Sequence, residues 1–306
     1  MTGILIIEQT LNGLQFGLML FLLAAGLTLV FGIMDMINLA HGSLYMLGAY
    51  LMASLAAATG SFLLGLVLAV LATGAIGAVL EFMLLRRLYE RDHLSQVLAT
   101  FALILIANES VRMLWGPQQM MLNAPAALAG PVELLPGMPY PAYRLAVIAV
   151  GLVVAAALYL LVTRTRMGMR VRAGASNREM AQAMGVDIRR LFTVVFAIGA
   201  MLCAVAGAML GPLLAVQIGM GEEILILAFV VIVIGGIGSI RGALVGALLV
   251  GMADTAGRAF LPILFRAFLP PEYASGIGPG LASIMIYLIM AGVLFWKPQG
   301  LFPARG

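Results

Sequence analysis

Residues 10–33 read TLNGLQFGLMLFLLAAGLTLVFGI, a stretch without a single charged side chain. Its length is close to the roughly 20 residues with which an α-helix crosses the hydrocarbon core of a bilayer. Similar apolar stretches recur along the chain, and we expect spans at residues 10–33, 44–58, 62–85, 94–114, 144–162, 191–214, 224–234, 243–260 and 280–296. The sequence therefore predicts an all-α, polytopic transmembrane helical bundle with about eight or nine spans.

Composition favours one transmembrane domain over residues 1–306. Hydrophobic residues make up 63% of the chain and charged residues 10%, with a mean hydropathy of +1.11. A soluble domain of this size needs more charge to cover its surface. The formal net charge of +4 does not indicate a nucleic-acid partner, because the arginines gather in short loops between apolar stretches.

The distribution of basic residues predicts the orientation in the membrane. With the C-terminus in the cytoplasm and nine spans, the cytoplasmic loops hold 13 of the 17 basic residues, and the N-terminus is periplasmic. The 13 are Arg86, Arg87, Arg91, Arg164, Arg166, Arg170, Arg172, Arg178, Arg189, Arg190, Arg241, Lys297 and Arg305. The segment 164–190 is then a cytoplasmic loop, and 115–143 is a periplasmic loop.

The cytoplasmic loop 164–190 contains a helix signal. Ser176 and Glu179 have the spacing of a capping box, in which a serine caps the first turn and a glutamate three residues later reciprocates. We therefore expect a short helix over 177–184, with Gly185 at its end as a C-terminal glycine.

The apolar residues of this short helix share one face. Met180, Ala183 and Met184 lie at positions i, i+3 and i+4. One interpretation is a helix that rests on anionic lipid headgroups. The other is a docking element whose methionine and small side chains insert into a groove on a cytoplasmic partner protein.

Two breaks interrupt the apolar pattern, at residues 35–43 and 235–242. Polar side chains at membrane depth are costly unless they are buried in protein or face water, and unwound backbone there can hold a polar ligand. Each break is either an ordinary cytoplasmic turn or part of a substrate path, and their likeness hints at an internal two-fold repeat. The candidate path residues are Asn38, His41, Ser43, Gly236, Gly238 and Ser239.

Glycines four residues apart predict close helix packing. The pairs are Gly207 with Gly211 and Gly242 with Gly246. Small residues at this spacing let the backbones of neighbouring membrane helices approach each other.

Several chemistries find little support in the residues. The only lysine, Lys297, precedes a proline, so the sequence lacks the Gly-Lys-Ser/Thr of a phosphate-binding loop. No His/Cys cluster predicts a metal site. An ion-coupled secondary transporter would need acids within the membrane, and Glu81 is the deepest acid of the predicted spans. An intramembrane enzyme would have only His41 with Ser43 or Ser239 as a catalytic set.

Six stretches together resemble one known family. They are residues 37–42 (INLAHG), 45–48 (YMLG), 165–168 (TRMG), 169–173 (MRVRA), 183–186 (AMGV) and 235–239 (GGIGS), the last followed by Gly242. In order and spacing they resemble the branched-chain amino-acid permeases of bacterial ABC importers, over about residues 9–298.

The resemblance implies a multi-pass subunit of the bacterial inner membrane that translocates leucine, isoleucine and valine and is not itself an enzyme. Its partners would be a second permease (a paralogue or itself), two cytoplasmic ATPase subunits and a periplasmic substrate-binding protein, within membrane lipid. ATP and magnesium would bind the ATPase, so this chain would need no cofactor of its own. The loop 115–143 would form part of the periplasmic surface that faces the binding protein. The ATPase-coupling residues would be Ser176, Arg178, Glu179, Met180, Ala183, Met184 and Gly185.

One departure from the family pattern concerns this coupling helix. In the family it usually carries more charge, including a lysine, than residues 177–184 do here. Members of the family also carry urea, short amides or aromatic acids. The same importer class with urea, short amides or other amino acids as substrate is therefore the alternative interpretation.

Overall fold

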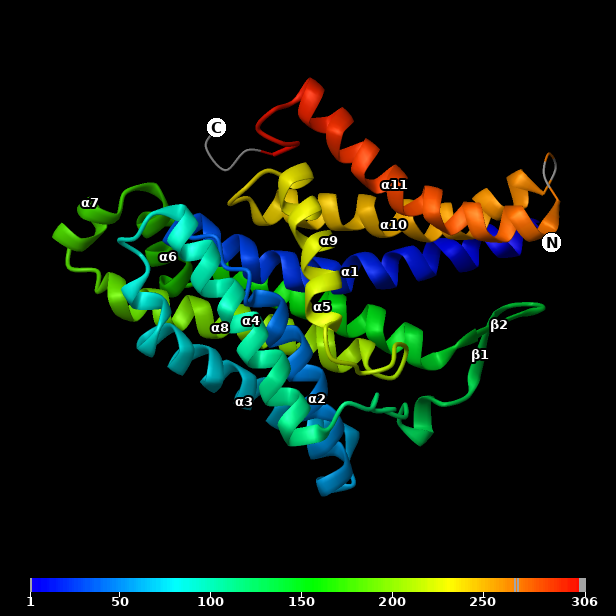
Figure 1. Ribbon diagram of the computed structural model, residues 1–306, viewed down its shortest axis with the longest axis horizontal. Helices are drawn as coiled ribbons and strands as arrows, with labels where there is room; N and C mark the ends of the chain where they lie inside the picture. The colour runs from blue at the N-terminus through cyan, green and yellow to red at the C-terminus, as the bar shows by residue number, and fades with distance from the viewer. Residues whose placement is uncertain (1, 267, 269, 303–306) are drawn as a thin grey trace. The chain divides into compact units, whose positions relative to one another are not determined.

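The structure, a computed structural model, describes residues 2–266, 268 and 270–302 (Figure 1). Its long helices are α1 (Thr2–Met34), α2 (His41–Thr59), α3 (Phe62–Met83), α4 (His93–Trp115), α5 (Ala142–Arg164), α8 (Ile188–Leu210), α10 (Ile240–Phe265) and α11 (Pro271–Trp296). The shorter elements are η1 (Leu85–Arg87), η2 (Ala126–Leu128), β1 (Pro131–Leu135), β2 (Met138–Pro141), α6 (Arg166–Ser176), α7 (Arg178–Ala183) and α9 (Met220–Gly235).

The predicted membrane class is confirmed. Among the described residues, eight helices are long and apolar enough to cross a membrane. The apolar helix α9 has only 16 residues, which is short for a span. The all-α prediction of about eight or nine spans therefore agrees with the structure.

Local capping chemistry sets several helix boundaries. Helix α2 ends at Gly60, whose φ of 66° is left-handed and suits a residue without a Cβ. The next residue, Ser61, caps α3, because its hydroxyl accepts a hydrogen bond from the amide of Leu64. Two long antiparallel helices thus meet in a turn of two residues.

The chain separates into two compact units. One comprises Met1–Phe21, Pro125–Leu152 and Leu227–Gly306, and the other comprises Leu22–Ala124 and Val153–Ile226. The chain passes from one unit to the other four times: within α1, between Ala124 and Pro125, within α5 and within α9. The single transmembrane domain expected from the sequence stays a prediction.

Small residues pack the core of the second unit, where α2, α3 and α8 contact one another. A Cβ at Gly48 of α2 would lie 2.5 Å from the Cα of Ala204 in α8. A Cβ at Gly207 would collide with the backbone carbonyl of Tyr45. The close packing predicted for Gly207 is therefore confirmed, and it brings the two helix backbones together without intervening side chains.

The first unit contains the helix pair α10–α11 and the hairpin β1–β2. Gly246 of α10 lies against the carbonyl of Val231 in α9, which confirms the second predicted glycine contact. In the hairpin the strands are antiparallel, with Val132 opposite Tyr140. The sequence predicted only a loop at 115–143, because its prolines and glycines mask a short strand pattern.

The hairpin is joined to α1 by polar contacts. The hydroxyl of Tyr140 donates a hydrogen bond of 2.9 Å to Oδ1 of Asn12, and the guanidinium of Arg144 donates one of 2.6 Å to the same oxygen. Burial raises the pKa of the Tyr140 phenol, so this donor keeps its proton in neutral solution.

Candidate functional site

The predicted cytoplasmic loop folds into two short helices, α6 and α7. Thr165 caps α6, and its Oγ1 accepts a hydrogen bond of 3.1 Å from the amide of Gly168. Asn177 caps α7, and its Oδ1 accepts one of 2.9 Å from the amide of Met180. Ser176, the predicted cap, is instead the last residue of α6. The prediction was one residue off because serine and asparagine cap helices about equally well.

The end of α7 follows the predicted glycine motif. Gly185 has a φ of 86°, and the amide of Val186 donates a hydrogen bond of 3.0 Å to the carbonyl of Ala181. Asp187 then caps α8 by accepting from the amide of Arg190. These caps hold a helix of only six residues between two fixed turns.

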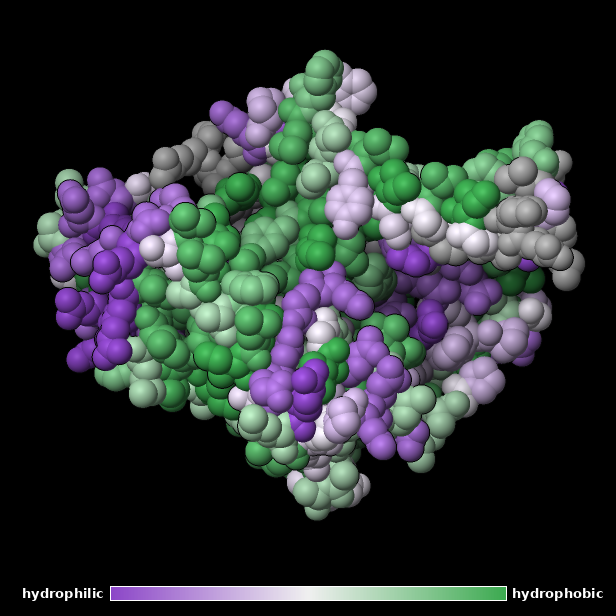
Figure 2. Space-filling view, in the orientation of Figure 1, coloured by the Kyte–Doolittle hydropathy of each residue, from purple (hydrophilic) through white to green (hydrophobic). Residues whose placement is uncertain are grey.

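Helix α7 has an exposed face and a face that contacts the protein. Met180 is 61% exposed, Met184 is 80% exposed, and Ala183 is also exposed. Ala181, on the other side, is 5% exposed. Figure 2 shows hydrophilic side chains gathered over α6 and α7. The exposed Met180 and Met184 therefore have polar surroundings. Exposed apolar side chains in a polar surface make this face of α7 a candidate contact for another protein or a membrane.

Arg178, on the inward side of α7, contacts the end of α1. Its Nε donates a hydrogen bond of 2.8 Å to the backbone carbonyl of Ile33, and its guanidinium carbon lies 5.6 Å from the centre of the Phe192 ring. Ile33 and Phe192 are both buried. Glu179 is exposed.

The first break runs from Asp35 to Ala40 and is shorter than the sequence indicated. Asn38 is fully buried, and its Oδ1 accepts a hydrogen bond of 3.1 Å from the amide of Ala40, which shapes the turn into α2. His41 and Ser43 lie in the first turn of α2, not in unwound backbone. Polar side chains such as histidine and serine predict a turn in an apolar sequence, but here tertiary packing buries both residues within the helix.

His41 occupies a slot between small residues. Its Nε2 lies 3.0 Å from Sγ of Cys203, and its ring meets Phe196 edge-on. The slot exists because Gly26 and Gly199 flank the ring: a Cβ on Gly26 would stand 2.8 Å from Nε2. His41 is fully buried among these groups.

The second break, in the other unit, contacts the C-terminal segment. Gly236 and Gly238 have φ values of 105° and 83°, and Ser239 caps α10 by accepting from the amide of Gly242. The amide of Leu301 donates a hydrogen bond of 2.9 Å to Ile234, and that of Phe302 donates one of 2.9 Å to Gly235. The break is thus lined by the chain's own C-terminal backbone.

A buried carboxylate gathers polar groups near the end of α3. Glu81 is 0% exposed and accepts hydrogen bonds from Thr193 at 2.5 Å, Tyr89 at 2.7 Å and Arg86 at 3.4 Å. The Tyr89 ring meets Phe192 edge-on. Burial, followed by the hydrogen bond to Glu81, raises the pKa of the Tyr89 phenol, so it donates its proton at neutral pH.

Replacement of Tyr89 by phenylalanine should destabilise the protein. It leaves Glu81 with one donor fewer in a buried position, at a cost of about 1–3 kcal/mol in the free energy of unfolding. Thermal unfolding of the purified protein in detergent would measure this. Tyr159→Phe, at a phenol that is 48% exposed, is the control. Equal unfolding temperatures for the two variants would contradict the role of this hydrogen bond.

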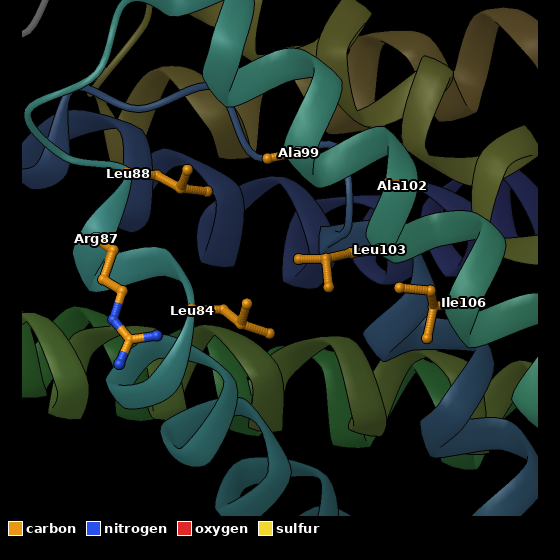
Figure 3. Close-up of a pocket in the computed structure, with 7 residues that line it drawn as sticks. All are labelled: Leu84, Arg87, Leu88, Ala99, Ala102, Leu103 and Ile106. Atoms are coloured by element: carbon orange, nitrogen blue, oxygen red, sulfur yellow. The ribbon is translucent and has the colours of Figure 1, made fainter.

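An apolar groove lies between the end of α3 and α4 (Figure 3). Its cavity volume is about 360 Å³. The lining residues are Leu84, Arg87, Leu88, Ala99, Ala102, Leu103 and Ile106. With a single charged side chain, the groove suits hydrocarbon better than a zwitterion, whose two charges both need partners. None of the candidate path residues lines it.

Comparison with known proteins identifies the family. The family described as "Branched-chain amino acid transport system / permease component" matches residues 9–294. The chain belongs to this permease family. The permease is 30% identical to the high-affinity branched-chain amino acid permease protein LivH of Escherichia coli, over 94% of this chain and 95% of the relative. It is 28% identical to BraD of Pseudomonas aeruginosa, over 96% and 95%. No solved structure matches.

A more distant relative extends the same description. The permease is 26% identical to the probable branched-chain amino acid permease protein LivH of Methanocaldococcus jannaschii, over 92% of this chain and 88% of the relative. These near full-length matches, together with the eight apolar helices among the described residues, make the permease a multi-pass membrane transport protein.

The structure groups the sequence-predicted residues of the permease in three places. The coupling residues lie together on and beside α7, and Asn38, His41 and Ser43 lie at the start of α2. The glycines of the second break and Ser239 lie at the start of α10, in the other unit. Sequence reasoning missed Cys203 beside His41 and Thr193 beside Glu81, because no periodic pattern links residues so far apart in the chain.

Proposed function

We propose that this chain is the membrane-spanning subunit of an ATP-driven importer that takes branched-chain amino acids into the bacterial cell. The observation that carries the proposal is the family match over residues 9–294. The relatives LivH and BraD are named as permease proteins of branched-chain amino acid transport systems. Their names favour leucine, isoleucine and valine as the substrates of this chain.

The energy source in this proposal is a partner ATPase, which holds ATP and magnesium. The exposed face of α7, formed by Met180, Ala183 and Met184, supports a docked protein, because flexible methionine side chains fill irregular grooves. The lipid-surface interpretation remains the alternative. It is less favoured because Arg178 and Ala181 fasten the opposite side of this short helix to the protein.

We further propose that α6 and α7 face the cytoplasm and that the hairpin β1–β2 faces the periplasm. The arginines of 164–190 support this orientation through the preference of basic loops for the inside. The hairpin then stands where a periplasmic binding protein delivers substrate. A second permease, identical or paralogous, would complete the membrane assembly.

We propose substrate-path residues at each of the two breaks, each considered within its own unit. In the first, Nδ2 of the buried Asn38 has no acceptor among the described residues, so this donor is available to a polar ligand. In the second, Gly236 and Gly238 have left-handed φ values and interrupt the helical backbone between α9 and α10. The proposed path residues are Asn38, His41, Ser43, Gly236, Gly238 and Ser239.

Competition for uptake tests the substrate class. The permease, its ATPase and its binding protein are reconstituted in proteoliposomes, and uptake of labelled leucine is measured with unlabelled competitors. We expect isoleucine and valine to compete, and urea, acetamide and phenylalanine to leave uptake unchanged. Competition by urea or acetamide, with none by valine, would reassign the substrate within the same importer class.

A further inference from the structure

We propose that Arg178 is the residue that transmits movement of the docking helix α7 to the end of α1. In this proposal the two faces of α7 have different contacts. The exposed methionine face receives the ATPase, and Arg178 passes the displacement to the break that precedes α2. The inference deepens the proposed function and rests on it.

The contact is directed at a group that needs a partner. The last four carbonyls of a helix receive no hydrogen bond from an amide of the same helix. Ile33 is the penultimate residue of α1, so its carbonyl is one of these four. Arg178 satisfies its buried carbonyl at 2.8 Å, across 145 residues of sequence. A cation at this position also opposes the negative end of the helix dipole. The hydrogen bond is therefore a specific tie rather than a surface contact.

The segment beyond the tie is poised to move. Asp35, two residues after Ile33, has a φ of 51°, which is uncommon for a residue other than glycine. Aspartate adopts this left-handed conformation more readily than most other residues that carry a Cβ, and Asp35 is the residue at which the backbone leaves α1. The break that follows leads within a few residues to the buried Asn38 and His41. A pull on the Ile33 carbonyl therefore acts on the backbone next to the proposed path.

Arg178 is also held on its other side. Its guanidinium lies over Phe192, and the Phe192 ring meets Tyr89, which donates to Glu81. The hydrogen bond from Nε and the contact with the Phe192 ring together fix the direction of the half-buried Arg178 side chain. The side chain thus connects α7 to α1 and α8, whereas Met184, at 80% exposure, is left free for docking.

The test measures docking and coupling separately in the complete complex. Wild type, Arg178→Ala and the control Arg170→Ala, an exposed arginine on α6, are purified with the ATPase and reconstituted with the binding protein. For Arg178→Ala we expect unchanged ATPase stoichiometry and a fall of about tenfold in leucine uptake per ATP hydrolysed, within the usual range of coupling between two sites. Arg170→Ala should match the wild type.

A second readout follows the break itself. Asp35 is exposed, so an Asp35→Cys variant can be labelled with a membrane-impermeant maleimide, and Cys203, at 0% exposure, contributes little background. The labelling rate should differ between the nucleotide-free and the vanadate-trapped complex, and Arg178→Ala should remove this difference. Arg178→Gln keeps a side-chain N–H that can reach the Ile33 carbonyl, and should restore most of the coupling.

The outcomes separate this inference from the function on which it rests. Arg178→Ala with unchanged uptake per ATP and an unchanged labelling difference would overturn the tie, as would loss of ATPase binding, which would make Arg178 a docking residue. Arg178→Met, of similar length but without a donor, replaces the alanine variant if that one does not insert. A wild-type permease that binds no ATPase would instead refute the proposed function.

Discussion

Met184→Asp should abolish co-purification of the permease with its ATPase. Met184, the C-cap residue that follows α7, is 80% exposed beside Met180 and Ala183, and docking there would bury it. An aspartate buried there without a partner charge costs about 3 kcal/mol or more, which weakens binding by more than about a hundredfold. Because the side chain points away from the protein, the substitution should leave membrane insertion and thermal stability unchanged.

The matched control for this experiment is Gln182→Asp. Gln182 is also exposed and lies in α7, about 200° around the helix axis from the C-cap residue Met184. It adds the same charge away from the apolar face, so the ATPase should bind as it does to the wild type. Equal binding by both variants would remove α7 as the docking element, and loss of binding in both would indicate a general effect of charge.

Gly42→Val should prevent the permease from folding. A Cβ at Gly42, in the first turn of α2, would collide with the backbone carbonyl of Gly221. Overpacking a core costs about 1–3 kcal/mol and occasionally more, and a backbone carbonyl moves aside less readily than the end of a flexible side chain. We expect a yield of monodisperse protein in detergent that falls to near zero.

A glycine without neighbours provides the comparison. A Cβ at Gly292, in α11, would meet no atom within 4 Å. Gly292→Val should therefore insert and unfold at nearly the wild-type temperature. A Gly42→Val protein that purifies and melts like Gly292→Val would contradict the close approach of α2 to Gly221.

The spans were predictable because their signal is strong and local. Residues 10–33 and 62–85 carry long apolar runs, and the structure places α1 and α3 there, although α1 begins earlier than expected, at Thr2. The short α7 was also predictable from its capping residues and from Gly185. The cap moved from Ser176 to Asn177 because α6 continues through Ser176, and its length depends on packing that the sequence does not display.

The side-chain contacts of the candidate site were not predictable from this one sequence. Cys203 lies beside His41 and Arg178 reaches Ile33, over separations of 162 and 145 residues. Periodicity reports only neighbours within a few residues, so it assigns a face but not the group that the face contacts. The resemblance to the permease family implied that Arg178 is a coupling residue, whereas the structure supplies its contact with α1.

Uptake of leucine into proteoliposomes that contain the permease, its ATPase and its binding protein tests the central claim most directly. The account predicts uptake that requires ATP with magnesium and is unaffected when ionophores collapse the proton and sodium gradients. Uptake by the permease alone, driven by an ion gradient and indifferent to ATP, would contradict it and identify a secondary transporter.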